Sequence, residues 1–167
     1  MELFKIQYDW IQRTRETLFR YCEEMSREHY ITELESFGGD SIRSLHAHTA
    51  NCYRIWLGER ALGRRMQAIE PLQIDSVAAM REVFRETDNL VQNFLDAFKG
   101  SWERAVSVRL RNGDSMEPTA LWLFTHTATH EFHHKGQIVK IGRQLGYIPP
   151  DTDLIEPIDK VMSHHSE

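Results

Sequence analysis

The sequence contains few of the features that mark exported, membrane-spanning or nucleic-acid-binding proteins. It has only two cysteines, Cys22 and Cys52, so free thiols in a reducing cytoplasm are expected rather than disulfides. No apolar run approaches the length of a membrane span, and the N-terminus lacks the continuous apolar core of a signal peptide. A net charge of −5 without a basic run argues against nucleic-acid binding. A soluble, cytoplasmic protein with no membrane or nucleic-acid partner is therefore expected.

Alternation of apolar and polar residues, the pattern of a β-strand, is also scarce. It occurs only over residues 104–111, where Val106, Val108 and Leu110 alternate with polar residues before the turn Asn112-Gly113-Asp114. One short extended segment cannot build a sheet. The 167 residues are therefore expected to form one all-α domain, 1–167.

Helical periodicity dominates the rest of the chain. It predicts helices over residues 3–29, 41–62, 75–99 and 115–145, followed by a polar tail, 151–167, with a helical turn or two around Ile155 to Met162. Suitable residues stand at the breaks: Asp40 or Ser41 and Asp75 or Ser76 as N-caps, and Gly146 with Pro149-Pro150 at the last stop. Four such helices predict a four-helix bundle, and the long connecting loops permit a crossover.

The most informative segment is THEFHHKGQI, residues 129–138, which places His130 and His134 four residues apart. Residues at that spacing share one helix face, so two imidazoles can bind one metal ion. Counting about 100° per residue from Leu123 puts both histidines on the stripe expected to face the core. Buried imidazoles need partners. A metal site is favoured, and a hydrogen-bonded core pair is the alternative.

The second predicted helix offers a third ligand. The same helical count places His48 on the inward face, with Cys52 one turn later, and turns His46 away. We expect His48 to be a third ligand or a hydrogen-bonded core histidine, and Cys52 to be a ligand or, more simply, a small buried filler. Three histidines would leave a coordination position open for water or substrate, as in catalytic sites.

Four more residues of the last helix are candidates for supporting roles. His126 is expected in the pocket lining or around the ligands, with direct ligation as the alternative. Gln137 and Glu131 are expected to orient substrate or a ligand imidazole, although the angle of Glu131 is equally consistent with exposure. His133 falls on the flank of the helix, where exposure or a pocket rim is expected.

Residues 130–134 also spell H-E-x-x-H, the motif of zincin peptidases, with Glu131 as the general base. The extended form of the motif needs Gly at position 137 and His at position 140, where the chain has Gln137 and Lys140. A third ligand at Glu156 would lie beyond Pro149-Pro150 in the polar tail, and no sheet is expected to align a peptide. A metallopeptidase is therefore the least favoured function.

Two segments resemble the patterns of DinB/YfiT-like proteins. Residues 41–62, SIRSLHAHTANCYRIWLGERAL, resemble their second helix. Residues 126–150, HTATHEFHHKGQIVKIGRQLGYIPP, resemble their fourth-helix signature H-x-x-x-H-x-x-x-H-R-G-Q, with Lys135 in place of the commoner arginine. The resemblance covers essentially the whole chain. It implies a four-helix bundle, commonly a homodimer, with zinc or nickel bound by His48, His130 and His134.

The resemblance implies a range of functions. Relatives include thiol-dependent transferases, such as bacillithiol transferases and mycothiol-dependent isomerases, and many members are named only for induction by DNA damage. We therefore expect one divalent ion that activates water or a low-molecular-weight thiol cosubstrate, for hydrolysis of a small-molecule substrate or S-transfer onto it. The alternative is a non-catalytic, metal-dependent stress sensor or ligand-binding protein.

Overall fold

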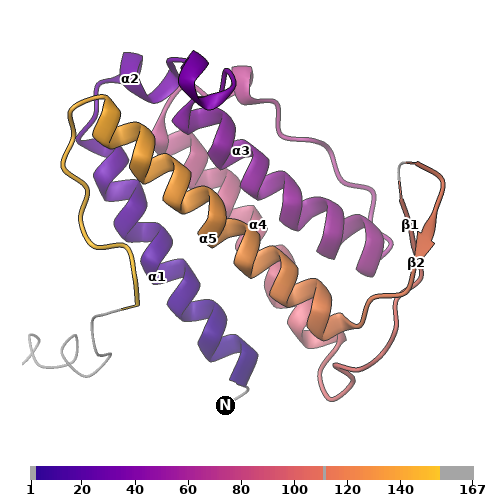
Figure 1. Cartoon of the computed structure of the whole chain (residues 1–167). Helices are drawn as coiled ribbons and strands as arrows, with labels where there is room; N and C mark the ends of the chain where they lie inside the picture. Colours follow the sequence, from indigo (N-terminus) through magenta and orange to yellow (C-terminus); the bar gives the residue numbers. More distant parts are fainter. Residues whose placement is uncertain (1–2, 111, 155–167) are drawn as a thin grey trace, which may run out of the picture.

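The computed structural model describes residues 3–110 and 112–154, and most of these residues are helical, as the sequence predicts (Figure 1). The main helices are α1 (Leu3–Glu23), α3 (Ile42–Tyr53), α4 (Val77–Ala97) and α5 (Ala120–Gln144). Helix α3 continues directly into a π-helix, η2 (Arg54–Ala61). Shorter helical pieces lie in the loops: α2 (Arg27–Ile31), η1 (Glu35–Phe37) and η3 (Pro71–Gln73). None of the helices in these described ranges is long and apolar enough to cross a membrane.

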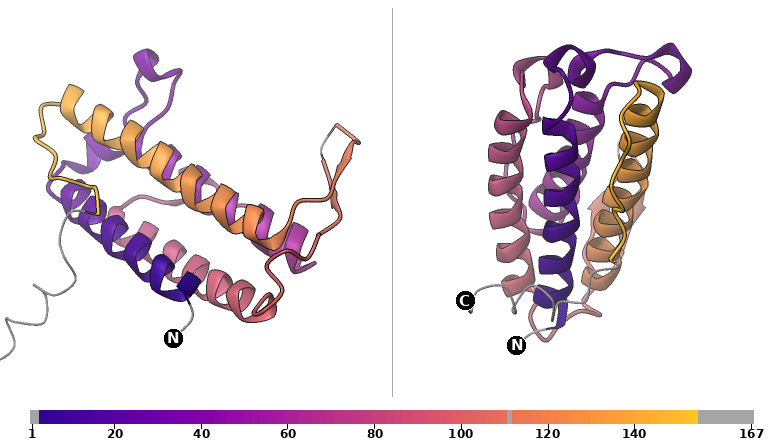
Figure 2. Two further views of the ribbon diagram at one scale, coloured as in Figure 1. Left: turned by 60° about the horizontal axis from the view of Figure 1, so that its bottom comes forward. Right: turned by 90° about the vertical axis from the view of Figure 1, so that its left-hand side faces the viewer.

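The main helices pack in a ring, in which α1 and α3 each contact both α4 and α5. Viewed as in the left panel of Figure 2, α3 and α5 form one layer and α1 and α4 form the other. Helices α1 and α5 run in one direction, and α3 and α4 run in the opposite direction (Figure 1). The loop between α3 and α4 therefore returns along the molecule, which is the kind of crossover that the long loops permit.

The first predicted helix, 3–29, is interrupted in the structure. Helix α1 ends at Glu23, and α2 begins after Ser26, whose extended backbone and side chain cap the new helix by accepting a hydrogen bond from the His29 N–H. A serine in this role competes with continuation of the first helix. The expected turns around Ile155 to Met162 lie outside the described residues.

The start of the last helix also differs from the prediction of 115–145. Residues Ser115–Met116 form strand β2, which pairs antiparallel with β1 (Val108–Arg109). The predicted extended segment is therefore one arm of a small hairpin. Helix α5 begins at Ala120, where the Thr119 side chain accepts a hydrogen bond from the Trp122 N–H. The N-caps of α3 and α4 are Ser41 and Ser76, both among the candidates from the sequence.

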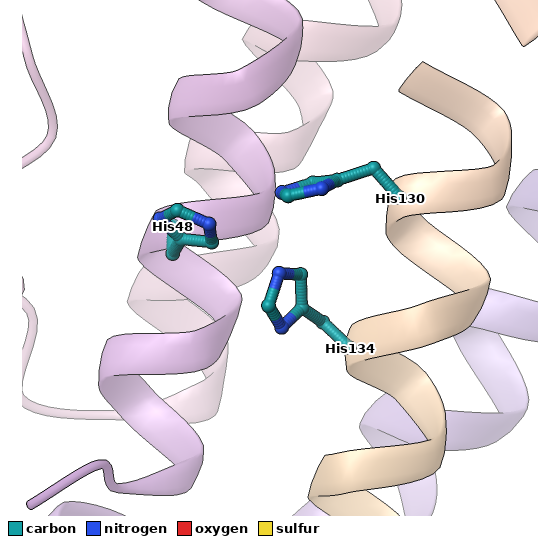
Figure 3. Close-up of side chains that lie close together, drawn as sticks. All are labelled: His48, His130 and His134. Atoms are coloured by element: carbon teal, nitrogen blue, oxygen red, sulfur yellow. The ribbon is translucent and has the colours of Figure 1, made fainter. Parts of the chain in front are cut away.

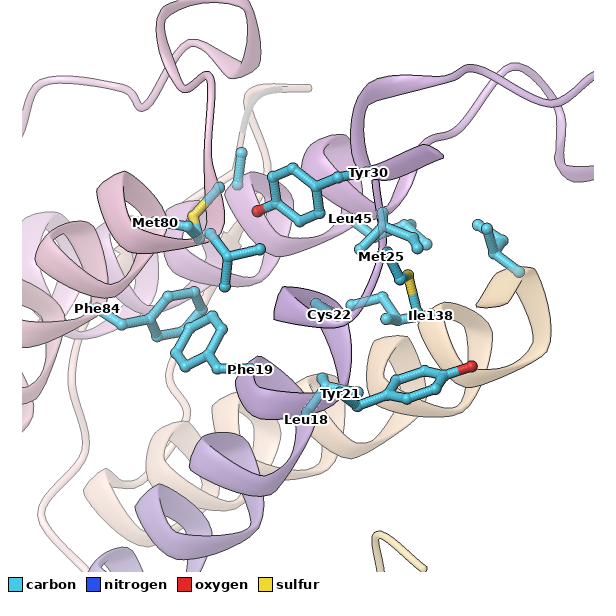
Figure 4. Close-up of a cluster of buried hydrophobic side chains, with 14 of the residues drawn as sticks. Leu18, Phe19, Tyr21, Cys22, Met25, Tyr30, Leu45, Met80, Phe84 and Ile138 are labelled. Carbon is cyan, nitrogen blue, oxygen red and sulfur yellow. The ribbon is translucent and has the colours of Figure 1, made fainter. Parts of the chain in front are cut away.

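Two apolar clusters fill the interior at opposite ends of the helices. Figure 4 shows one of them, where Phe19, Tyr30 and Phe84 pack among side chains from α1, α2, α3, α4 and α5. On α1 that cluster begins at Leu18, and the other cluster ends at Ile11. Polar side chains occupy the space between the two clusters.

Candidate metal centre

The contact between α3 and α5 brings together three histidines, as Figure 3 shows. The ring centroids of His48 and His130 are 4.9 Å apart, those of His48 and His134 are 4.7 Å apart, and those of His130 and His134 are 4.4 Å apart. One nitrogen from each ring can be chosen so that all three lie within 4.8 Å of one another. Neutral imidazoles in such a group can hold one metal ion.

The three histidines lie at a solvent-facing seam between α3 and α5 rather than in the centre of the molecule. His48 is exposed, His130 is half-buried and His134 is buried. The predicted orientation of α3 is therefore wrong: His46, which was expected to face away, is 2% exposed and packs against Phe19. Burial and the charge of Arg15 lower the pKa of His46 to about 3, so this side chain is a neutral core residue.

The hydrogen bonding of two of the imidazoles leaves a ring nitrogen available to bind a metal ion. The Nδ1–H of His134 donates to Oε1 of Gln137 at 2.6 Å, which leaves Nε2 as the free ligand atom. Nε2 of His130 is buried, and it has no hydrogen-bond partner within the described part of the chain. Buried polar atoms of this kind require an explanation, and a bound ion provides one.

The protonation states are also suited to metal binding. Burial, together with the charges of His134, His48 and other neighbouring histidines, lowers the pKa of His130 to about 4. Burial likewise lowers the pKa of His134, against the opposing effect of its hydrogen bond to Gln137. Both imidazoles are therefore neutral at pH 7, and an ion need not displace a proton to bind them.

An aromatic wall, formed by Trp56, Trp122 and His126, stands beside the three histidines. The rings of Trp122 and His126 are parallel, 4.9 Å apart, and Trp56 lies 4.7 Å from His126. The guanidinium of Arg60 covers the Trp56 ring at 3.9 Å. Burial and the charge of Arg60 lower the pKa of His126, whose ring is 5.9 Å from that of His130. His126 therefore lies in the surroundings of the three histidines and outside the group itself.

Two other candidates have positions that limit their roles. Cys52 is buried and does not belong to the group of potential ligands, and burial raises the pKa of its thiol to about 12. It is a core filler, the simpler of its two expected roles. His133 is exposed, as its flank position predicts, with its ring 4.9 Å from that of His134.

Glu131 occupies a position that the helical angles did not indicate. Its side chain is not among the potential ligands: it is buried and accepts hydrogen bonds from Arg15 at 2.7 and 3.0 Å and from Tyr53 at 2.7 Å. These bonds engage both carboxylate oxygens, which argues against Glu131 as the base of a peptidase. The sequence contained one signal: Arg15 lies one turn after Ile11, on the apolar stripe of the first helix, where a charged residue needs a buried partner.

Comparison with known proteins places the chain in a family. No curated protein matches the chain. The model of the DinB family matches residues 3–160, which is nearly the whole chain. The protein therefore belongs to the DinB family.

Proposed function

We propose that this protein binds one divalent transition-metal ion, zinc or nickel, through His48, His130 and His134, and that it uses the ion to transform a small molecule. In this proposal the ring of main helices is the four-helix bundle that the family resemblance implies. The supporting observation is the convergence of three imidazoles beside solvent. Two of these imidazoles carry lowered pKa values.

The composition of the group favours an open site over a closed structural one. It contains three potential ligands among the described residues, whereas structural zinc sites use four protein ligands. An ion held this way supplies Lewis-acid activation of water or of a low-molecular-weight thiol at the remaining position. The exposure of His48 allows a small molecule to approach, and the aromatic wall offers an apolar surface for its organic part. The reaction class we propose is S-transfer from a thiol cosubstrate, or hydrolysis.

The ligand assignment is tested by elemental analysis of purified protein and of the variants His48→Ala, His130→Ala and His134→Ala. Wild-type protein should carry about one ion per chain, and each variant should lose most of it, because two imidazoles bind far more weakly than three. The matched control is His133→Ala, which removes an exposed histidine of the same helix and should retain the ion. Full metal content in dialysed His48→Ala would refute the three-histidine site.

The catalytic part is tested with metal-loaded protein, using bacillithiol, mycothiol and glutathione against a chlorinated or epoxide electrophile. Turnover that a chelator abolishes and added metal restores would support the transferase. A hydrolase would instead turn over small esters or amides without any thiol. Tight ligand binding without turnover in either assay would favour the non-catalytic sensor. Cleavage of peptides from a test panel would favour the metallopeptidase instead.

A further inference from the structure

Polar groups from all four main helices meet where the two apolar clusters adjoin, four of them on buried residues and one on a half-buried residue. This central network consists of Tyr8 and Arg15 from α1, Tyr53 from α3, Asp88 from α4 and Glu131 from α5. On α4, Asp88 lies between Phe84 of one cluster and Val91 of the other. At this level of the molecule, hydrogen bonds connect all four main helices in addition to the apolar packing.

The bonds of the network engage all three guanidinium nitrogens of Arg15, one of which also donates to the Tyr8 hydroxyl at 3.3 Å. Its guanidinium donates to both oxygens of Glu131, at 2.7 and 3.0 Å, and to Oδ1 of Asp88 at 2.6 Å. The hydroxyl of Tyr53 donates to Oε2 of Glu131 at 2.7 Å, and the hydroxyl of Tyr8 donates to Oδ1 of Asp88 at 2.6 Å. The network thus has two halves: Tyr53 joins α3 to α5, and Tyr8 joins α1 to α4.

Because these groups are buried, they cannot replace a lost hydrogen bond with a bond to water. Arg15 and Glu131 are each 4% exposed, and Tyr8 and Tyr53 are 0% exposed. Burial alone would lower the pKa of Arg15, but the charge of Glu131 and the hydrogen bonds to it raise the pKa well above its usual value. Buried ion pairs contribute little net stability, because desolvation offsets their attraction, and their best-attested benefit is to select one arrangement of the helices. Fixing the positions of the helices is therefore the role to test for this network.

One half of the network joins the same two helices that carry the histidines. Glu131 lies on α5 between His130 and His134, and Tyr53 lies on α3 five residues, about one and a half turns, after His48. The histidines meet on the solvent side of the α3–α5 contact, while Tyr53 and Glu131 meet in the interior. A hydrogen bond at this place restricts both the rotation of each helix and the sliding of one along the other.

We propose that the bond from Tyr53 to Glu131 is a positioning contact for the metal centre, holding His48 at the distance from His130 and His134 that one ion requires. This inference rests on the proposed metal-binding function. Both residues act through the helix backbones and touch neither ion nor substrate. Glu131 is thus assigned a different role from the general base of an H-E-x-x-H peptidase. Its carboxylate fixes the position of α5 relative to α3 from the interior side of the helix contact.

The network supplies its own matched control. Tyr53→Phe and Tyr8→Phe each remove the hydroxyl of a fully buried tyrosine that donates to a carboxylate at nearly the same distance, and the Tyr8 hydroxyl also accepts a longer bond from Arg15. Only the first of these bonds connects the two helices that carry the histidines. The experiment measures Zn²⁺ affinity by chelator competition and the visible absorption of bound Co²⁺, together with thermal unfolding of the metal-free proteins.

The expected result is selective. Tyr53→Phe should bind Zn²⁺ about 10–100-fold more weakly than wild type, the range found when groups supporting metal ligands are removed, and should alter the Co²⁺ spectrum. Tyr8→Phe should lose a similar amount of thermal stability and keep wild-type affinity and spectrum. Unchanged affinity in Tyr53→Phe would overturn the inference, as would an equal loss in both variants. Wild-type protein that binds neither ion would refute the proposed function and this inference together.

A second pair of variants keeps the test decisive if Tyr53→Phe does not fold. Glu131→Gln and Asp88→Asn each neutralise one carboxylate bound to Arg15, in the α3–α5 half and the α1–α4 half respectively. Glu131→Gln should weaken Zn²⁺ binding more than Asp88→Asn does, because an amide is a poorer acceptor for Tyr53. Equal effects on affinity would contradict the positioning role.

Discussion

At the scale of single residues, the proposed metal centre includes a supporting side chain that is not one of its histidines. Gln137 accepts the Nδ1–H of His134 and so selects the tautomer that presents Nε2. Replacing Gln137 with Leu should lower Zn²⁺ affinity about 10–100-fold while leaving one ion bound per chain at saturation. Chelator competition measures this change.

The control for Gln137 lies on the same helix. Gln144 is exposed and bonds to Ser36 at 2.9 Å, outside the three histidines. Gln144→Leu should therefore bind Zn²⁺ as wild type does. Wild-type affinity in Gln137→Leu would show that His134 adopts the required tautomer without help.

Residue spacing predicted the pairing of His130 with His134 but not the faces of the helices. The i, i+4 spacing is a property of the backbone, so it is visible in one sequence. The buried faces of α3 and α5 include His46 and Glu131, which a hydrophobic pattern counts as outward. Their burial depends on partners from other helices, Arg15 above all for Glu131, and no pattern within one helix reveals such a partner.

At the scale of helices, α1 and α5 approach closely at Gly142. A Cβ atom there would lie 2.8 Å from Cζ of Tyr21 and 2.9 Å from Cε of Met25, both on or next to α1. Gly142→Ala should therefore destabilise the protein by about 1–3 kcal/mol, as overpacking typically does. Urea unfolding measures the change in free energy.

The opposite result is expected for the other glycine of α5. A Cβ at Gly136 would meet nothing within 4 Å, and the position is exposed in the helix interior. Gly136→Ala should stabilise the protein by up to about 1 kcal/mol through helix propensity. A loss of stability in both variants would mean that space at the α1–α5 contact is not the deciding factor.

Helix ends were only partly readable from the sequence. Serines before apolar periodicity indicated the starts of α3 and α4 correctly, because an N-cap is a local interaction. The start of α5 was missed because Ser115–Met116 pairs with Val108–Arg109. A two-residue strand depends on its partner and leaves almost no alternation to detect. The continuation of α3 as a π-helix, which places Trp56 against Trp122, also had no visible signal.

At the scale of the whole molecule, an ion that binds only the folded chain must stabilise it. Zn²⁺ at about 100 times its dissociation constant should add about 2.7 kcal/mol. For a chain of 167 residues this corresponds to a rise in melting temperature of roughly 5–10 °C. Circular dichroism melts with and without Zn²⁺ measure the rise, with His130→Ala as the control that should show little change. An equal rise in that variant would place the ion elsewhere on the protein.

The packing of α3 against α5 has a consequence for the order of events during synthesis. His48 and His130 are about eighty residues apart, and the intervening segment includes all of α4. A nascent chain that has not yet released α5 from the ribosome presents His48 without His130 and His134. Contacts between such distant segments form late, because closing a long loop is entropically costly. Under the proposed function, a metal ion bound by all three histidines would therefore distinguish completed chains from truncated ones.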